Sequence, residues 1–486
     1  MSHELLTLQP QSLWKYFYEL TQIPRPSKHE AEVSQYVVEF GKKHGLETIV
    51  DEVGNVIIRK PATPGMENRK GVILQAHLDM VPQKNEDTDH DFNKHPLKPY
   101  VDGEWVKASG TTLGADNGIG VAAAMTVLVS SDLQHGPVEG LFTIDEETGM
   151  TGAFGLKAGL IQGDVLLNMD SEDEGELYIG CAGGTNVNAR FTFQEVKVPA
   201  GMTTFKLTVK GLKGGHSGLD IPLGRGNSNK ILNRLMWVAE REFGLRLSSI
   251  NGGSLRNAIP RESFAVVGIP ESNTTAFLTF VKELAVIVHK ELSAVEPDLT
   301  ILVEKVAAPA TFIDDQTQHN LLNAIYACPN GVIRMSNEME GLVETSTNLA
   351  IVKSANGEIH LQCLLRSSVD SAKTDLEQTI QSVFEMAGAE IMFNGQYQGW
   401  KPNPDSPILK VMLEVYEKKF GKVPEIRAIH AGLECGILGG AYPNWDMISF
   451  GPTIRFPHSP DEKVNITTVE KFWDFLVETL KDIPVK

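Results

Sequence analysis

The chain has 486 residues, of which 42% are hydrophobic and 22% charged, and its 62 acidic and 44 basic side chains give a net charge of −18. This length exceeds one hydrophobic core, so we expect two or three domains. The acidic balance argues against nucleic acid or an anionic membrane as a partner, and no apolar run approaches the roughly 18 residues that span a bilayer. The start of the chain does not have a signal-peptide pattern, and the four cysteines have no CxxC spacing, so we expect a reducing, cytoplasmic location.

Two amphipathic helices are predicted near the start of the chain. The first has apolar side chains at helical spacing, at Leu13, Trp14, Phe17 and Leu20. The second would begin at a capping box formed by Ser27 and Glu30.

Strand-like segments follow at 47–60, 71–77, 140–145 and 164–170, and helical patterns such as 118–131 separate some of them. This alternation predicts an α/β sheet flanked by helices. In such sheets functional groups gather where the strands end.

From about residue 187 the pattern becomes α+β. A run of strand, helix, two strands, helix and strand is followed by a similar order of elements up to residue 401, which predicts two related halves. The prolines of "QGWKPNPDSP" then suit a linker, after which helix and strand alternate again to the end.

Acidic and histidine residues stand at the ends of the predicted strands, namely His77, Asp79, Asp116, Asp145, Glu146, Glu147, Asp170 and His458. Any one of them is more often a turn former or a satisfied polar group. Together they predict a cation site, because buried carboxylates repel one another unless a positive charge neutralises them. Imidazoles and carboxylates without thiolates suit zinc or a similar divalent metal. Alternation along a strand puts His77 and Asp79 on one face, so that Asp79 could brace the imidazole.

The segments "HLDM", "GADNGIG", "DEETG", "NMDSED" and "PHSPDE" resemble those of the M20 family of dinuclear zinc peptidases. The similarity runs nearly end to end and is greatest to the members that cleave aminoacyl-histidine dipeptides. It implies two Zn²⁺ per subunit, with Co²⁺ or Mn²⁺ as possible substitutes. His77 and Asp170 would hold one ion, Glu147 and His458 the other, and Asp116 would bridge both.

The resemblance also implies the catalytic roles. Asp79 would orient His77. Glu146 would be the general base that takes a proton from a water shared by the two metals and passes it to the departing amine.

Further residues would bind substrate, as the resemblance implies. His216 would help to hold the carbonyl oxyanion, often in the site of the neighbouring subunit, although by itself "GGHSG" also suits an exposed turn. Asn257 and Arg366 would bind the free carboxylate, with Arg261 as a rival for Arg366 and surface ion pairing as the alternative for both arginines. Gly432 could offer its N–H to the same carboxylate, and Glu434 could meet the amino group. The nearby His430 has no comparable support.

The 288 positions between Asp170 and His458 predict an inserted domain, since both would share one site. We therefore expect an α/β catalytic domain, with a mixed, mostly parallel sheet, formed by residues 1–186 and 402–486. Residues 187–401 would form an α+β lid of two related halves that also carries a homodimer interface.

The leading hypothesis is a metal-dependent dipeptidase acting on unblocked dipeptides, with a preference for Xaa-His that includes β-alanyl-histidine. Another M20 activity remains open: a tripeptidase, an aminopeptidase or an N-acyl amino-acid deacylase. Two other classes are a non-catalytic peptide- or metal-binding protein and a structural or regulatory oligomer.

Overall fold

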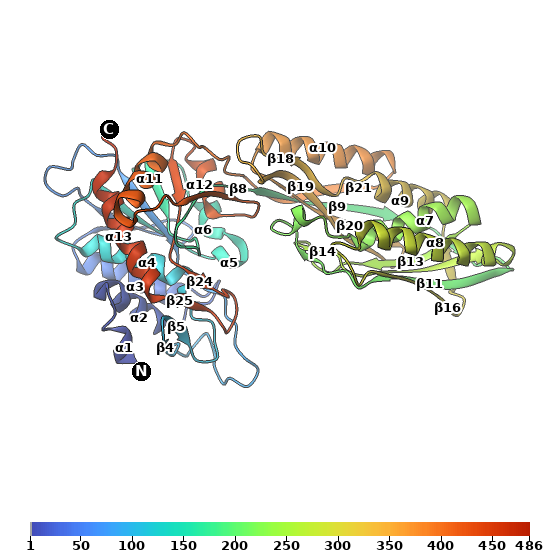
Figure 1. Cartoon of the computed structure of the whole chain (residues 1–486), viewed down its shortest axis with the longest axis horizontal. Coiled ribbons are helices and arrows are strands. Elements are labelled where there is room, and N and C mark those ends of the chain that lie inside the picture. Colours follow the sequence, from blue (N-terminus) through green and yellow to red (C-terminus); the bar gives the residue numbers. More distant parts are fainter. Residues whose placement is uncertain (1) are drawn as a thin grey trace. The chain divides into compact units, whose positions relative to one another are not determined.

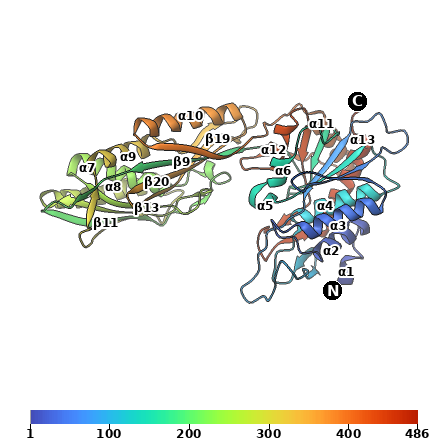
Figure 2. The same ribbon diagram turned by 180° about the vertical axis from the view of Figure 1, so that it is seen from behind.

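The computed structural model describes residues 2–486, which form two compact units. Unit 1 contains the chain up to Gly180 together with Pro402–Ala428 and Leu433–Lys486, and unit 2 contains Cys181–Lys401 and Ile429–Gly432. The chain therefore leaves unit 1 after Gly180, returns to it at Pro402, and enters unit 2 once more for Ile429–Gly432. Each unit has its own sheet and helices (Figures 1 and 2).

Unit 1 is built on an eight-stranded sheet with the order β1-β2-β6-β3-β7-β23-β8-β22. Its strands are β1 (Glu47–Val50), β2 (Val56–Lys60), β3 (Val72–His77), β6 (Val138–Thr143), β7 (Val165–Asn168), β8 (Glu176–Cys181), β22 (Glu425–Ile429) and β23 (Asp446–Ser449). The central strands β6, β3, β7 and β23 pair in parallel, and antiparallel pairs follow on either side, so the predicted mixed sheet is confirmed.

The central strands are buried because their sequences are nearly continuous apolar runs, as parallel strands covered on both faces require. Since they run in the same direction, their carboxyl ends lie at one edge of the sheet. The segments that follow β3, β6 and β7 carry Asp79, Glu146 and Asp170, so sheet topology brings these three residues to a common edge.

The helices of unit 1 are α1 (Ser2–Leu5), α2 (Gln11–Thr21), α3 (Ala31–Lys43), α4 (Ala115–Val129), α5 (Glu146–Gly149), α6 (Thr151–Gly155), α11 (Pro407–Phe420), α12 (Glu434–Ala441) and α13 (Ile466–Asp482). Helix α2 buries the predicted stripe that includes Trp14 and Phe17, and it packs on α4, which lies against β3. Helix α4 is apolar all round and almost entirely buried, as a helix between a sheet and another helix must be.

The predicted capping box is wrong. Helix α3 begins at Ala31 without a side-chain cap. The Ser27 hydroxyl instead donates to Asp79 (2.8 Å), and the Glu30 carboxylate accepts N–H groups of Lys28 (2.8 Å) and Asp145 (3.1 Å). These two side chains make long-range contacts at the sheet edge, and the local spacing gave no sign of them.

A small antiparallel sheet completes unit 1, with the order β24-β25-β5-β4. Its strands are β4 (Pro99–Asp102), β5 (Trp105–Ala108), β24 (Ile454–Arg455) and β25 (Lys463–Asn465). The loop between β24 and β25 carries His458, so this sheet anchors both ends of that loop.

Unit 2 contains a nine-stranded sheet with the order β16-β11-β15-β13-β19-β20-β9-β21, and β18 pairs with β19. The strands are β9 (Gly183–Thr192), β11 (Met202–Lys210), β13 (Arg246–Gly252), β15 (Ser263–Pro270), β16 (Thr300–Lys305), β18 (Gly331–Met335), β19 (Val343–Ala355), β20 (Glu358–Ser367) and β21 (Glu390–Tyr397). Short pairs add β10 (Glu195–Lys197) with β17 (Thr311–Ile313) and β12 (Gly215–His216) with β14 (Ala258–Ile259).

The order of unit 2 is symmetric about the junction of β13 and β19. Reading outward, β13-β15-β11-β16 on one side corresponds to β19-β20-β9-β21 on the other. Helices α7 (Ser228–Phe243) and α8 (Thr274–Leu292) belong to the first half, and α9 (Asp315–Ala327) and α10 (Asp370–Met386) to the second. The two related halves expected from the element order are therefore visible in the strand order.

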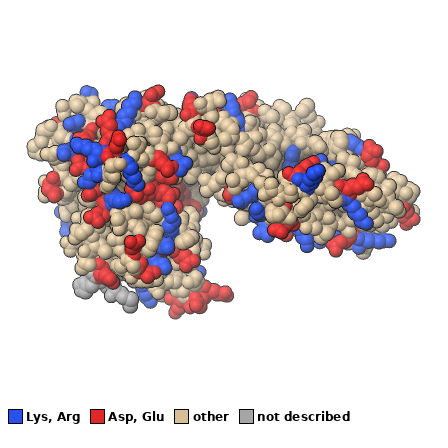
Figure 3. Space-filling model, in the orientation of Figure 1, with Lys and Arg blue, Asp and Glu red and all other residues tan. Residues whose placement is uncertain are grey.

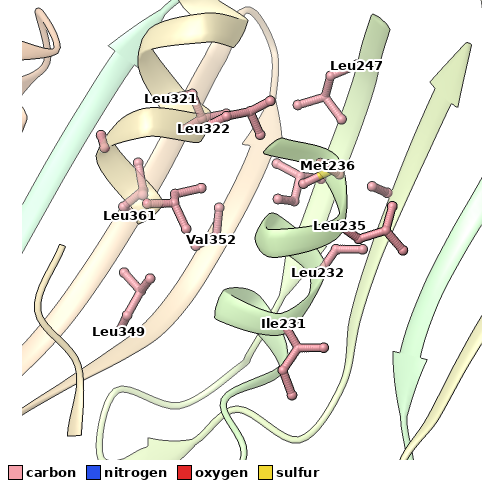
Figure 4. Packing of buried hydrophobic residues seen from close by; sticks show 14 of the residues in the cluster. Ile231, Leu232, Leu235, Met236, Leu247, Leu321, Leu322, Leu349, Val352 and Leu361 are labelled. Atoms are coloured by element: carbon pink, nitrogen blue, oxygen red, sulfur yellow. The ribbon is translucent and has the colours of Figure 1, made fainter. Parts of the chain in front are cut away.

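The core of unit 2 lies between its helices and the sheet. Figure 4 shows Met236 of α7 beside Leu321 and Leu322 of α9, and Ile231, Leu232 and Leu235 of α7 among the strands; all of them belong to one buried hydrophobic cluster. The side chains of α7 recur three and four positions apart, which puts them on one helical face.

The surface drawn in Figure 3 has acidic and basic side chains interspersed, and that face offers no continuous basic surface of the kind nucleic acids contact. Among the described helices, none combines the length and apolar character needed to cross a bilayer. The four cysteines form no disulfide.

Candidate metal centre and active site

The end of β3 positions His77 and Asp79. Both are buried, with 1% and 0% of their surface exposed. The Nδ1 atom of His77 lies 3.3 Å from Asp79 Oδ1 and 3.2 Å from the Asp79 carbonyl oxygen. With its Nδ1–H directed at Asp79, the imidazole turns Nε2 toward the opposite side, where a neutral ring would present its lone pair, which is the arrangement of a metal-binding histidine with a supporting carboxylate.

Asp116, in the first turn of α4, lies between two groups of ligand atoms. Its Oδ1 is 3.1 Å from Nε2 of His77, and its Oδ2 is 3.3 Å from Nε2 of His458. Each carboxylate oxygen thus faces a different imidazole, as a bridging ligand would.

Asp170 and Glu147 complete the two groups. Asp170 Oδ1 is 3.2 Å from Nε2 of His77 and also accepts from the Asn117 amide. Glu147 Oε2 is 2.9 Å from Nε2 of His458. The residues therefore fall into a set of His77, Asp116 and Asp170 and a set of Asp116, Glu147 and His458, each with its ligand atoms within 4.8 Å of one another.

Glu146 lies next to both sets. Its potential ligand atom lies within 4.8 Å of those of His77 and Glu147. Asp79 also fixes the Glu146–Glu147 segment, because its two oxygens accept the backbone N–H groups of Glu146 (3.0 Å) and Glu147 (3.2 Å). Asp79 therefore aligns β3 with the start of α5.

Two residues in these segments have a left-handed backbone conformation, which residues other than glycine rarely adopt. Asp145, which precedes Glu146, has φ 51°, and His458 has φ 59°. Left-handed non-glycine residues of this kind persist where the surrounding contacts hold them, and they cluster at functional sites.

The electrostatics of the cluster call for a cation. Burial raises the pKa of Asp170 to about 6, with Asp116 and Glu147 adding to the effect against the opposing charge of His77. Burial and the charges of Asp170, Glu434 and Glu147 raise the pKa of Glu146 well above its usual value. The pKa of His458 rises to about 11 because Asp116 and Glu147 accept its hydrogen bonds.

The residues present fit divalent metal ions. The donors are imidazole nitrogens and carboxylate oxygens, which zinc and related metals accept, and Glu147 Oε1 is buried without a hydrogen-bond partner. A cation would supply both the missing partner and the missing charge.

Polar side chains of the adjacent strands β6, β3, β7 and β23 form a hydrogen-bonded row across the sheet that ends at Glu434. Gln75 of β3 donates to the buried Glu434 (2.6 Å), as does Thr143 of β6 (2.9 Å). Asn168 of β7 donates to Gln75 (2.5 Å) and accepts from Ser449 of β23. Both donors bind Oε2 of Glu434, whereas Oε1 is buried without a partner.

A second group of predicted site residues lies within unit 2. Arg366 of β20 is 6% exposed, and its Nε has no hydrogen-bond partner. Its Nη1 donates to the Tyr397 hydroxyl (3.3 Å), and its Nη2 is 3.5 Å from Nε2 of His216. Among the described residues, no carboxylate forms an ion pair with this guanidinium, so the group is suited to an anion.

His216 presents its second nitrogen as a donor. Its Nδ1 accepts the N–H groups of Gly218 (3.2 Å) and Leu219 (3.1 Å), which places the proton of the neutral ring on Nε2. Burial and the charge of Arg366 lower the pKa of His216 and so favour this neutral form.

The remaining predicted residues of unit 2 lie near this group. The Asn257 carbonyl accepts from Ser217 N (2.9 Å), beside His216, although the Asn257 side chain is exposed. A Cβ on Gly432 would lie 3.2 Å from the Tyr397 ring. Arg261 is exposed.

Several residues that contact the predicted site residues were not predicted from the sequence. His430 is buried, and its Nε2 is 2.7 Å from the Ser346 hydroxyl. Burial and the charge of Arg366 lower the pKa of His430 to about 3. Tyr397, Gln75 and Glu462 were also missed. Only Glu462 had a visible signal, because it belongs to the same "PHSPDE" segment as His458.

Known proteins resemble the chain over its whole length. A cytosol non-specific dipeptidase of Escherichia coli (strain K12) is 48% identical over 99% of this chain and 100% of its own. The crystal structure of an aminoacylhistidine dipeptidase from Vibrio alginolyticus has 52% identity and a TM-score of 0.95, with full coverage of both chains. An aminopeptidase PepT from Bacillus cereus shares the fold at 16% identity and a TM-score of 0.58, with 98% of this chain and 99% of that chain covered. Residues 73–482 match the profile of peptidase family M20/M25/M40, and the chain therefore belongs to that family.

Proposed function

We propose that the protein is a dinuclear metal-dependent dipeptidase that hydrolyses unblocked dipeptides, including Xaa-His. The observation that carries the proposal is Asp116, whose two oxygens face two separate pairs of ligands, His77 with Asp170 and His458 with Glu147. The names of the relatives from Escherichia coli and Vibrio alginolyticus support the substrate class.

The proposed cofactors are two Zn²⁺ ions. His77 and Asp170 would hold one, Glu147 and His458 the other, and Asp116 would bridge them. Co²⁺ or Mn²⁺ could occupy the same donors, because selectivity among these metals depends on geometry and availability more than on ligand type. When bound, the metals would polarise the scissile carbonyl and lower the pKa of a water molecule.

The chain's own groups would move the proton. Glu146 is the proposed general base, accepting a proton from the attacking water and returning it to the departing amine. Asp79 holds the Glu146 backbone through an N–H bond of 3.0 Å, which limits the positions that the carboxylate can reach.

Glu434 is the proposed receptor for the substrate's α-ammonium group. It is fully buried, Gln75 and Thr143 bind only its Oε2, and its Oε1 has no partner. A buried carboxylate oxygen without a donor gains most from a cationic N–H group.

Arg366 and His216 are the proposed receptors for substrate oxygens. Both present N–H donors without an acidic partner, so an anionic or polarised oxygen would satisfy them. Arg366 suits the free carboxylate and His216 the carbonyl oxyanion. Asn257 and the Gly432 N–H are proposed to assist them.

A substrate panel tests the function. We expect β-alanyl-histidine and ordinary Xaa-His dipeptides to be cleaved, and N-acetylated or C-terminally amidated versions to be cleaved much more slowly. Equal rates on many Xaa-Xaa dipeptides would identify a non-specific dipeptidase, and better cleavage of tripeptides or N-acetyl amino acids would favour the other M20 activities. Tight peptide binding without turnover in metal-loaded protein would refute the proposed enzymatic function.

Replacing Glu434 by Gln should selectively reduce the use of the free amine. Loss of one charge-assisted hydrogen bond of about 1.5–3 kcal/mol predicts a roughly 10- to 150-fold fall in kcat/KM for Ala-His. The N-acetyl analogue, which has no ammonium group, serves as the control and should change little. An equal fall for both substrates would show that Glu434 does not read the amine.

We propose a cytosolic location, in keeping with the name of the Escherichia coli relative and the absence of disulfides among the four cysteines. We also propose a homodimer formed through unit 2.

A further inference from the structure

Glu462 lies four residues beyond His458 in the loop between β24 and β25, and its side chain reaches the start of α4. It is 2% exposed. Its Oε2 accepts the N–H groups of Leu113 (2.7 Å) and Gly114 (3.0 Å), and its Oε1 accepts those of Ala115 (2.8 Å) and Asp116 (3.2 Å). One carboxylate thus binds four consecutive backbone amides, the last of which belongs to the proposed bridging ligand.

This contact joins two parts of the proposed metal centre. The loop that supplies His458 is attached to Asp116 twice, once through the Asp116 N–H and once through the 3.3 Å approach of His458 Nε2 to Asp116 Oδ2. The Glu462 N–H donates to the Ser459 carbonyl (2.9 Å), so His458 and Glu462 lie on one compact turn.

Arg25 makes the matching connection from the other side. Its buried guanidinium donates to the carbonyls of Leu78 (2.9 Å) and Asp79 (2.9 Å) through Nη1 and to that of Gly114 through Nη2 (2.5 Å). Burial lowers the pKa of Arg25, and the charge of Glu462 is foremost among the carboxylates that oppose this shift. Arg25 therefore ties the end of β3, with His77 and Asp79, to the same turn that Glu462 binds.

Two glycines of the "GADNGIG" segment make room for this arginine. A Cβ on Gly114 would lie 2.5 Å from Arg25 Nη2, and one on Gly118 would lie 2.7 Å from it. Gly114 also has φ 67°, a conformation that glycine adopts without strain. The spacing of these glycines is explained by the space that the guanidinium occupies.

We infer that Glu462 and Arg25 are positioning residues, which hold Asp116 so that its two oxygens face His77 and His458 at the same time. The inference rests on the proposed metal-dependent function. Buried groups that orient ligands typically affect metal affinity by about 10- to 100-fold when removed. A residue that only capped α4 would affect folding but not the affinity of the folded protein for metal.

The test is Glu462→Gln, which keeps the side-chain size but replaces one acceptor oxygen by an NH₂ donor and removes the charge. Zn²⁺ affinity is measured on metal-stripped protein by competition with a chelating dye, below the melting temperature of each variant. We expect the dissociation constant of at least one Zn²⁺ to rise by about 10- to 100-fold.

Glu139→Gln is the matched control. Glu139 is 5% exposed and likewise accepts two backbone N–H groups, from Gln162 (2.8 Å) and Gly163 (2.7 Å), and an arginine, Arg59 (2.9 Å). It lies near the start of β6, away from the strand ends that carry the ligands. Its replacement should lower Tm and leave Zn²⁺ affinity unchanged.

An unchanged Zn²⁺ affinity in Glu462→Gln, or an equal loss in Glu139→Gln, would overturn the inference. If Glu462→Gln does not fold, Arg25→Lys provides the same test, because lysine keeps the charge but lacks the fork that joins Gly114 to β3; unchanged affinity there has the same meaning. Wild-type protein that binds no Zn²⁺ would instead refute the proposed function.

Discussion

Glu146→Gln is expected to lower kcat by about 10²–10⁴-fold, the usual contribution of a positioned general base, while the protein retains its metal. The amide cannot accept the proton of the attacking water, but it occupies nearly the same volume as the carboxylate. Metal analysis of the purified variant and kcat with Ala-His are the two measurements.

Glu147→Gln is the matched comparison, one position along α5. Glu147 Oε2 is 2.9 Å from His458 Nε2, and the two residues are the proposed ligands of one ion. Removing the Glu147 carboxylate should therefore reduce metal content as well as turnover. Appreciable activity in fully metal-loaded Glu146→Gln would contradict the role of base. Loss of metal from Glu146→Gln equal to that from Glu147→Gln would show that Glu146 is a ligand.

Removal of the metal is expected to abolish hydrolysis and to lower Tm. Without a cation, the closely spaced carboxylates of Asp116, Glu147 and Asp170 repel one another, and Glu147 Oε1 has no partner. A ligand present at 100 times its Kd stabilises the folded state by about 2.7 kcal/mol, or roughly 5–10 °C in Tm for a domain of about 200 residues.

The measurement compares activity and Tm of dialysed holoenzyme, chelator-treated protein and chelated protein to which Zn²⁺, Co²⁺ or Mn²⁺ is returned. Recovery on adding metal separates loss of the ion from irreversible unfolding. Full activity in protein shown by elemental analysis to hold no transition metal would refute the metal-dependent mechanism.

Local sequence patterns identified the elements well where the apolar side chains follow one another at a regular spacing. The apolar run from Val72 to Leu74 predicts β3, and the stripe of Trp14 and Phe17 predicts α2, because both patterns depend on neighbours a few residues away. The capping box failed for the same reason. Ser27 and Glu30 have the right spacing, but Asp79 and the Asp145 N–H compete for them across the fold.

The residues of the site were predictable because they belong to recognisable segments, whereas their supports were not. Gln75 lies within an apolar strand, Arg25 lies in a proline-rich turn, and Tyr397 ends an exposed strand, so no local pattern marks any of them. Their importance depends on which side chains of distant segments they contact.

The sequence by itself determined the residue types of the centre, two imidazoles and several carboxylates at strand ends, and the family to which they point. Only the tertiary structure decided that one oxygen of Asp116 faces His77 and the other faces His458. It also decided that Glu462 binds the backbone at the start of α4, which includes the Asp116 N–H. Finally, it placed His430 and Gly432 in unit 2. The chemical types of neighbouring side chains can be identified from a short segment. Contacts between positions hundreds of residues apart depend on strand order and packing, which no short segment specifies.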